Sequence, residues 1–360
     1  MYRMVFACVM LLVWSFSPTA MADVQVKKLM KQKWIGVESE RFSVMSNASP
    51  KKAGEMLDEL ENFNYFMTDV LGFKQNNLEK KIPVILAKNK SSFVAMGIAK
   101  EYAGVFSKRS DGDVIFARAD KFRAATKGSN WGRSIVLHEL VHLLISGSIF
   151  ELSTPPWFNE GVAEYFSTYK QTKDSVVLGD MSILGNRFYG LIEGNGRRYE
   201  SVDTASLFKV RQADLKVGAG NSRKHNDFLD KFYARSVAVV HYLNADVDRR
   251  KQMYLYLHLR DKEHAYDAAF EYAFKMTYAE FDALVDEYIR GKYMLGRTFP
   301  VGPGAVEFPI VEKTPVDITL DEAMETLFLR ISGFSDRFLG EGVRYKMNSD
   351  FEKLIPGFFE

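Results

Sequence analysis

Two histidines spaced four residues apart are the side chains of this chain best suited to chemistry. They belong to the sequence H-E-L-V-H at residues 138–142. Residues at positions i and i+4 lie on one face of a helix, so His138 and His142 can share one Zn²⁺ ion. Glu139 lies between them and can act as the general base on a water at a remaining coordination position. This spacing therefore predicts a metal centre that can activate water.

A second segment, W-F-N-E-G-V-A-E-Y at residues 157–165, offers a third ligand. Two histidines and Glu160, with the fourth position open, are typical of a catalytic rather than a structural zinc site. Glu164 lies one helical turn beyond Glu160, on the same face. It has two equally good interpretations: a carboxylate that orients a ligand histidine from behind, or a solvated helix carboxylate.

Both segments have the surroundings of helices. Residues 131–145 are apolar nearly all round, which predicts a buried helix, and Gly147 suits its end. Pro155 and Pro156 precede the second segment, where proline favours the start of a new helix. The alternative is a core helix whose two histidines are satisfied by other groups. We favour the metal site over this alternative, because a single metal ion would satisfy all the buried polar groups at once.

The rest of the chain predicts two lobes and an extension. Residues 23–130 mix strands and helices: strands at 41–46, 81–87, 104–108 and 113–117, the last two forming a hairpin, and a helix from Ser49-Pro50 to Phe66. Pro83 suggests an edge strand or an early position in its strand.

Residues 131–296 form a mostly helical lobe, with further helices at 228–243, 248–260, 263–274 and 278–291. Thr277 and Glu280 have the spacing of a capping box. Residues 179–220 have no clean period and predict irregular structure. Residues 297–318, rich in Gly and Pro, predict a linker. Residues 319–360 predict a C-terminal helical extension that docks on the helical lobe.

Composition and the N-terminal segment bear on the partners and the cellular location of the protein. A formal net charge of +2 over 360 residues gives no case for nucleic-acid binding. Residues 1–22 have the charge, apolar run and Ala20-Met21-Ala22 site of a cleaved signal peptide, so the mature chain is expected to begin at Asp23. The alternative is an uncleaved anchor, but the apolar run is short for a membrane span. The one cysteine, Cys8, lies in this segment, so a periplasmic or secreted protein without disulfides is expected.

Residues 34–293 resemble the gluzincin zinc metallopeptidases, in which H-E-x-x-H is followed some 17–19 residues later by a glutamate on a helix. The closest likeness is to the peptidase MA-type domains of bacterial exported proteins. The resemblance implies an α+β, thermolysin-like fold with a sheet-bearing N-terminal lobe, a mostly helical C-terminal lobe and the zinc cleft between them. It also implies His138, His142 and Glu160 as Zn²⁺ ligands, Glu139 as base, and a peptide or protein substrate.

The resemblance further implies a donor for the oxyanion of the tetrahedral intermediate, taken from a downstream helix. Tyr233 is the first candidate, ahead of Tyr199 and His225, and the alternative interpretation of Tyr233 is a core aromatic. His241, His258 and His264 are interpreted as surface or core residues.

Two other functions remain open: a catalytically silent, zinc-containing binding or chaperone-like envelope protein, and a structural envelope protein that docks through its C-terminal segment. Intact Glu139 argues against the first, because a protein without turnover does not need the base.

Overall fold

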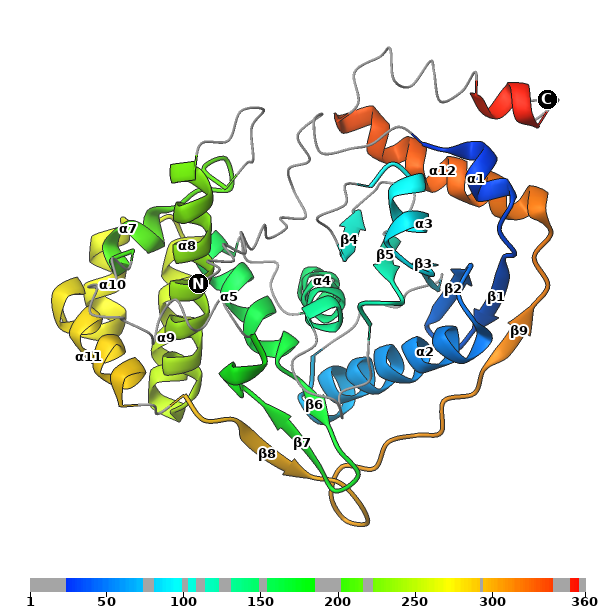
Figure 1. The fold of residues 1–360 in the computed structure, drawn as a ribbon. Helices are drawn as coiled ribbons and strands as arrows, with labels where there is room; N and C mark the ends of the chain where they lie inside the picture. The colour runs from blue at the N-terminus through cyan, green and yellow to red at the C-terminus, as the bar shows by residue number, and fades with distance from the viewer. Residues whose placement is uncertain are drawn as a thin grey trace, which may run out of the picture. The chain divides into compact units, whose positions relative to one another are not determined.

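The fold was analysed in a computed structural model, which describes residues 24–73, 81–98, 103–107, 114–122, 131–148, 154–184, 202–215, 223–291, 294–338 and 350–355. The protein is a mixed α and β structure (Figure 1). It divides into two compact units, each described by itself below. The helical unit comprises Leu140–Lys216 and Asn221–Val306, and the sheet unit comprises the described residues before and after these. Among the described residues, none of the helices is long and apolar enough to cross a membrane.

A six-stranded mixed sheet forms the centre of the sheet unit. Its strand order is β4-β5-β3-β2-β1-β9. The neighbouring strands β5, β3 and β2 run parallel, and β4, β1 and β9 each pair antiparallel with a neighbour. In this order, the strands are β4 (Gly104–Ser107), β5 (Val114–Arg118), β3 (Ile82–Ala87), β2 (Phe42–Ser46), β1 (Ile35–Glu38) and β9 (Thr314–Val316).

Helices cover both faces of this sheet. Helix α2 (Pro50–Tyr65) packs against β1 and β2. The first half of α4 (Trp131–Ser148) lies near the other edge, where Ile135 packs against Gly104, and an ion pair between Arg133 and Glu59 joins α4 to α2. The opposite face carries α1 (Val26–Met30), α3 (Lys90–Ala95) and α12 (Leu320–Phe338), whose apolar side chains share one core with the sheet. The parallel strands β2, β3 and β5 are therefore buried on both faces, as their nearly continuous apolar sequences require.

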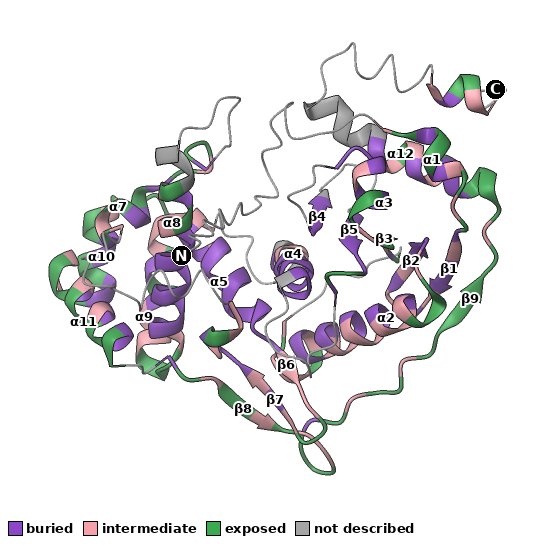
Figure 2. Ribbon diagram, in the orientation of Figure 1, coloured by how far each residue is buried: buried purple, intermediate pink, exposed green. Residues whose placement is uncertain are grey.

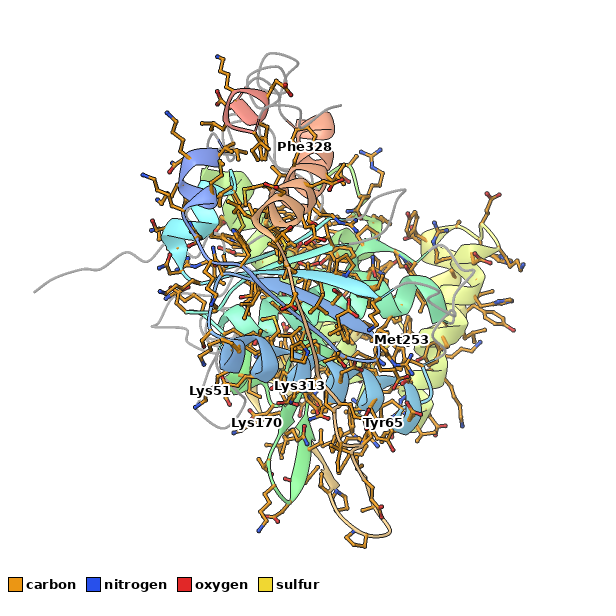
Figure 3. All side chains as sticks on the ribbon, turned by 90° about the vertical axis from the view of Figure 1, so that its right-hand side faces the viewer. Lys51, Tyr65, Lys170, Met253, Lys313 and Phe328 are labelled. Carbon is orange, nitrogen blue, oxygen red and sulfur yellow. The ribbon has the colours of Figure 1, made fainter. Side chains whose placement is uncertain are left out.

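The C-terminal extension packs differently from the expectation drawn from the sequence. Ala323, Met324 and Leu327 of α12 are fully buried in the core of the sheet unit, beside Trp34 and Ile85. Phe328 of this helix, labelled in Figure 3, also contacts Phe351, with 5.0 Å between ring centroids. The prediction that this extension docks on the helical lobe is therefore wrong, because its apolar face completes the second face of the sheet.

The segment 297–318 was predicted to be a linker, but it contributes a strand to each unit. In the helical unit, β8 (Arg297–Pro300) pairs antiparallel with β7 (Ser175–Leu178). In the sheet unit, β9 pairs antiparallel with β1, although Pro315 lies within it. Proline is tolerated in an edge strand because its missing N–H can face away from the neighbouring strand.

The helical unit is built mainly from α5 (Pro156–Ser167), α8 (Arg223–Asn244), α9 (Val247–Asp261), α10 (Tyr266–Phe274) and α11 (Tyr278–Arg290). Between α5 and α8 lie β6 (Lys170–Gln171), β7, the 3-10 helix η4 (Met181–Leu184) and α7 (Thr204–Lys209). Its core is aromatic: the rings of Trp157 and Phe208 stack with centroids 4.1 Å apart, and Tyr256 and Phe270 surround Phe208. This cluster holds the first turn of α5 against α7, α9 and α10.

Buried polar side chains of α8 also join elements of this unit. The buried Arg235 of α8 donates to Asp282 and Asp286 of α11 at 2.7 and 2.6 Å. The buried His241 of α8 bonds Gly179 O at 3.0 Å through Nε2 and the Tyr288 hydroxyl at 2.9 Å through Nδ1. Burial lowers the pKa of His241, so the neutral ring is favoured.

Most helices and strands predicted from the sequence are present, although some bounds differ: the helix predicted at 228–243 spans Arg223–Asn244, and that predicted at 263–274 spans Tyr266–Phe274. Ser49 caps α2 by accepting from the Lys52 amide, and Thr277 and Glu280 form the predicted capping box of α11. The predicted hairpin strands pair antiparallel as β4 and β5. Pro83 occupies the second position of β3, an early position, but β3 is an interior strand of the sheet. The predicted irregular region 179–220 contains η4 and α7 among its described residues.

Candidate metal centre

Helix α4 places His138, Glu139 and His142 together. One possible ligand atom from each of the three side chains lies within 4.8 Å of the other two. His138 is 7% exposed and Glu139 is 2% exposed. Because all three residues belong to two consecutive turns of one helix, the helix itself sets their spacing. The cluster predicted from the spacing of H-E-L-V-H is thus present in the structure.

The burial of α4 follows from its sequence. Val136, Leu137, Leu140, Val141 and Leu144 are all buried. Figure 2 shows the described part of this helix buried on nearly every side, whereas α9 to α11 expose one face. A helix buried all round has no solvent to satisfy imidazole and carboxylate groups, so these groups require partners inside the protein.

Helix α5 brings a second carboxylate to His142. Pro156 occupies the first helical position, and Glu160 follows one turn later, 3% exposed. Glu160 Oε2 lies 3.5 Å from His142 Nε2. Both residues belong to the helical unit, so this distance depends only on the packing within that unit. The second carboxylate predicted from the sequence therefore lies beside His142.

The other ring nitrogen of His142 is also engaged. Asn159 Oδ1 lies 3.3 Å from His142 Nδ1. An amide oxygen can only accept, so this contact favours the tautomer with the proton on Nδ1. Nε2 then presents its lone pair on the side of Glu160. A metal-binding histidine usually has this arrangement, with its second nitrogen donating to a carbonyl or carboxylate oxygen.

The donor set fits a zinc ion. Zinc–nitrogen and zinc–oxygen bonds of about 2.1 Å at a tetrahedral angle put two ligand atoms about 3.4 Å apart. The separation of 3.5 Å between His142 Nε2 and Glu160 Oε2 matches that value. It is longer than a charge-assisted hydrogen bond of about 2.7–2.9 Å. Two imidazoles and one carboxylate are also ligand types that zinc prefers.

Gly161 fixes where α5 meets α8. A Cβ added at Gly161 would lie 2.6 Å from Ser236 O and 2.7 Å from Val240 Cγ2, both on α8. These distances are too short for any real side chain, so only glycine permits this approach of the two helices. The glycine next to Glu160 therefore sets the depth at which the carboxylate is presented to His142.

The remaining predicted site residues are buried, and their roles stay predictions. Glu164 is 4% exposed, as a carboxylate behind a ligand would be. Its burial excludes the alternative of a solvated helix carboxylate. Tyr233 is 2% exposed and lies edge-on to Phe232, with centroids 5.5 Å apart. Tyr199 and the side chain of His225 lie outside the described residues.

The other histidines have the positions expected from the sequence. His241 is a core residue held by two hydrogen bonds, and His258 and His264 are exposed.

Sequence reasoning missed the contact of Asn159 with His142. The residue stands directly before Glu160, and an asparagine on the same helical turn as a ligand was the available signal. It missed the packing role of Gly161 as well, because a glycine inside a helix indicates close approach without naming the partner. Comparisons of the whole chain with protein-family models and with curated proteins found no match.

Proposed function

We propose that this protein is a zinc-dependent metallopeptidase of the gluzincin type. The observation that carries the proposal is the 3.5 Å separation of His142 Nε2 and Glu160 Oε2, beside the His138, Glu139 and His142 cluster. It supports a site in which His142 of α4 and Glu160 of α5 converge, with His138 and Glu139 on the same helix as His142. His138, Glu139 and Glu160 are buried, and burying ionisable groups is costly without partners or a function for them.

The chain's own residues divide the work. His138, His142 and Glu160 would hold the ion, and Asn159 would keep the His142 ring in its binding tautomer. A bound zinc ion supplies Lewis acidity, which polarises a carbonyl and acidifies water. Glu139 would accept the proton of the attacking water and return it to the leaving amine. Tyr233 would donate to the oxyanion, and Glu164 would orient a ligand histidine.

A peptide substrate and a thermolysin-like architecture are the finer parts of this proposal. They are supported by the order of elements, in which a mixed sheet with an antiparallel β4–β5 edge precedes the histidine helix in the chain. The helix carrying Glu160 then follows, and most of the later elements are helical. This order is the one implied by the resemblance of residues 34–293 to gluzincins.

The first test is metal content with peptide hydrolysis. Protein purified without chelator should contain about one zinc per chain, and it should cleave a mixed peptide library with loss of activity on chelation. Glu139→Gln should keep the metal while hydrolysis falls by roughly 10²-fold or more. Glu287→Gln, which removes an exposed carboxylate of α11, is the matched control and should leave both properties unchanged.

Two results would contradict the proposal. If purified wild-type protein contains no stoichiometric metal, the proposed metal centre is excluded. Metal without chelator-sensitive cleavage of any peptide would instead favour the catalytically silent zinc protein.

Export to the periplasm or the medium is also part of the proposal. It is supported by the composition of residues 1–22, which lie outside the described residues. Sequencing the N-terminus of protein from its native host should find a start at or near Asp23. A mature chain that begins at Met1 would exclude cleavage.

A further inference from the structure

A cavity lies in the sheet unit and is lined by none of the residues of the metal centre. It has a volume of about 680 Å³ and lies between α2, the turn before β2 and the segment 309–312. This segment, called the strap below, is fastened on both sides. Phe308 contacts the Tyr65 ring, with centroids 5.7 Å apart, and Lys313 pairs with Asp58. Tyr65 and Lys313 are labelled in Figure 3. The strap is therefore a fixed wall of the cavity.

The lining of this cavity is acidic. Glu40, Glu61, Asp69 and Glu312 contribute four carboxylates, and Arg41 contributes the one guanidinium of the lining, which leaves a formal excess of three negative charges. Of the carboxylates, Glu61 is the most deeply placed: it is 8% exposed and accepts from the Arg41 backbone amide at 2.7 Å. An acidic cavity attracts cations, because a bound positive charge offsets the repulsion among the carboxylates that line it.

A buried amide in the wall adds an independent observation. Asn64 lines the cavity and is 1% exposed, yet neither its side-chain oxygen nor its side-chain nitrogen has a hydrogen-bond partner among the described residues. Burying both ends of an amide without partners destabilises a fold, so such a group in a native protein calls for a functional reason. The residue stands two positions before the π-helix η2 (Phe66–Val70), and π-helices occur frequently at functional sites.

We propose that this cavity binds a small organic cation that carries a primary ammonium or guanidinium group. Such a ligand would donate to Asn64 Oδ1 and to the Glu61 carboxylate, while its charge offsets the excess of acid. The volume suits a small organic molecule rather than a bare metal ion, because ligand pockets measure about 300–1,000 Å³. This inference stands apart from the proposed peptidase activity and does not depend on it.

Isothermal titration calorimetry of the full-length protein with agmatine tests the proposal, since agmatine carries both a primary ammonium and a guanidinium group. Wild-type protein should bind it, and succinate, a dianion of similar length, should not bind. Asn64→Leu should weaken binding about tenfold or more, because a hydrogen bond to a charged group is lost. The same variant should melt at a higher temperature, because leucine has a similar volume and buries no unpartnered amide.

A second variant keeps the test independent of the folding of the first. Glu312→Gln on the strap should weaken agmatine binding with little change in melting temperature, since Glu312 lines the cavity and is exposed, and glutamine keeps its size but removes its charge. Glu325→Gln is the matched control, because it removes an exposed carboxylate of α12 in the same unit and should leave binding unchanged.

Three outcomes would overturn the proposal: no binding of agmatine by the wild type at millimolar concentration, unchanged binding by both Asn64→Leu and Glu312→Gln, or binding of Ca²⁺ alone. The last would show that the carboxylates form a metal site.

Discussion

Replacing Gly161 with alanine should separate α5 from α8 and disturb the metal centre. The added Cβ would lie 2.6 Å from Ser236 O, a backbone atom that no rotamer change can move. A carbon–oxygen contact of about 3.3 Å is the closest comfortable approach, so the helices must shift by roughly 0.7 Å. Overpacking of this kind costs about 1–3 kcal/mol, and alanine returns about 0.5–1 kcal/mol as a better helix former. The net loss of stability should be about 1–2 kcal/mol.

Gly54→Ala provides the matched control for this change. Gly54 lies inside α2, and the nearest atom to an added Cβ is Lys313 Cδ at 3.6 Å, an ordinary contact. Only the helix-propensity gain of about 0.5–1 kcal/mol should remain, so the two glycine-to-alanine variants should change stability in opposite directions. Urea denaturation followed by circular dichroism measures both.

Because Glu160 is adjacent, Gly161→Ala should also weaken zinc binding, by about tenfold or more in a titration against a competing chelator. A Gly161→Ala protein as stable as the wild type, with unchanged zinc affinity, would refute both the close approach of the helices and its role in placing the ligand.

Two further predictions concern single side chains of the helical unit. Glu160→Ala should abolish tight zinc binding, whereas Glu164→Ala should weaken it by roughly 10- to 100-fold, and a chelator titration that finds the reverse order would exchange their roles. His241 predicts a pH dependence of stability: its folded pKa is lowered from the value of 6.5 that applies when it is unfolded, so the unfolded chain binds more protons at pH values just below 6.5. The contribution of His241 to the free energy of unfolding should therefore be fully present above about pH 6.5 and decline as the pH falls below it. Urea denaturation at several pH values should show a weaker dependence of this free energy on pH in His241→Phe than in the wild type. The same dependence in both proteins would exclude His241 as the cause.

The histidine helix could be predicted because several sequence signals agree there. An apolar run without a polar face predicts a buried helix, and the spacing of His138 and His142 puts both imidazoles on one side of it. Local patterns of this kind also predict the caps of α2 and α11, where Ser49 and Thr277 accept from backbone amides three residues later. In each case the deciding interaction spans fewer than five residues.

The position of α12 could not be predicted in the same way. Its apolar stripe indicates that one face is buried, but the stripe is the same whichever surface it meets. Only the assembled sheet shows a face that α1 and α3 leave incomplete, and there Met324 and Leu327 join Ile85 in one core. Likewise, β9 is a strand because β1 offers it an unpaired edge, and its own three residues, Thr-Pro-Val, do not predict it. Partners distant in sequence decide both elements.

The order of the three residues Asn159, Glu160 and Gly161 in α5 is fixed by what each of them contacts. Consecutive residues on a helix point about 100° apart, so Asn159, Glu160 and Gly161 face three directions. Two of these directions meet the same imidazole: Asn159 contacts Nδ1 of His142 and Glu160 lies opposite Nε2, so one side chain fixes the tautomer that the other requires. The third residue can carry no side chain, because α8 lies so close on that side that it excludes a Cβ. Moving the glycine by one position would push α5 away from α8 and replace a residue that contacts His142, so the packing of this helix and the chemistry of the site depend on the same three residues.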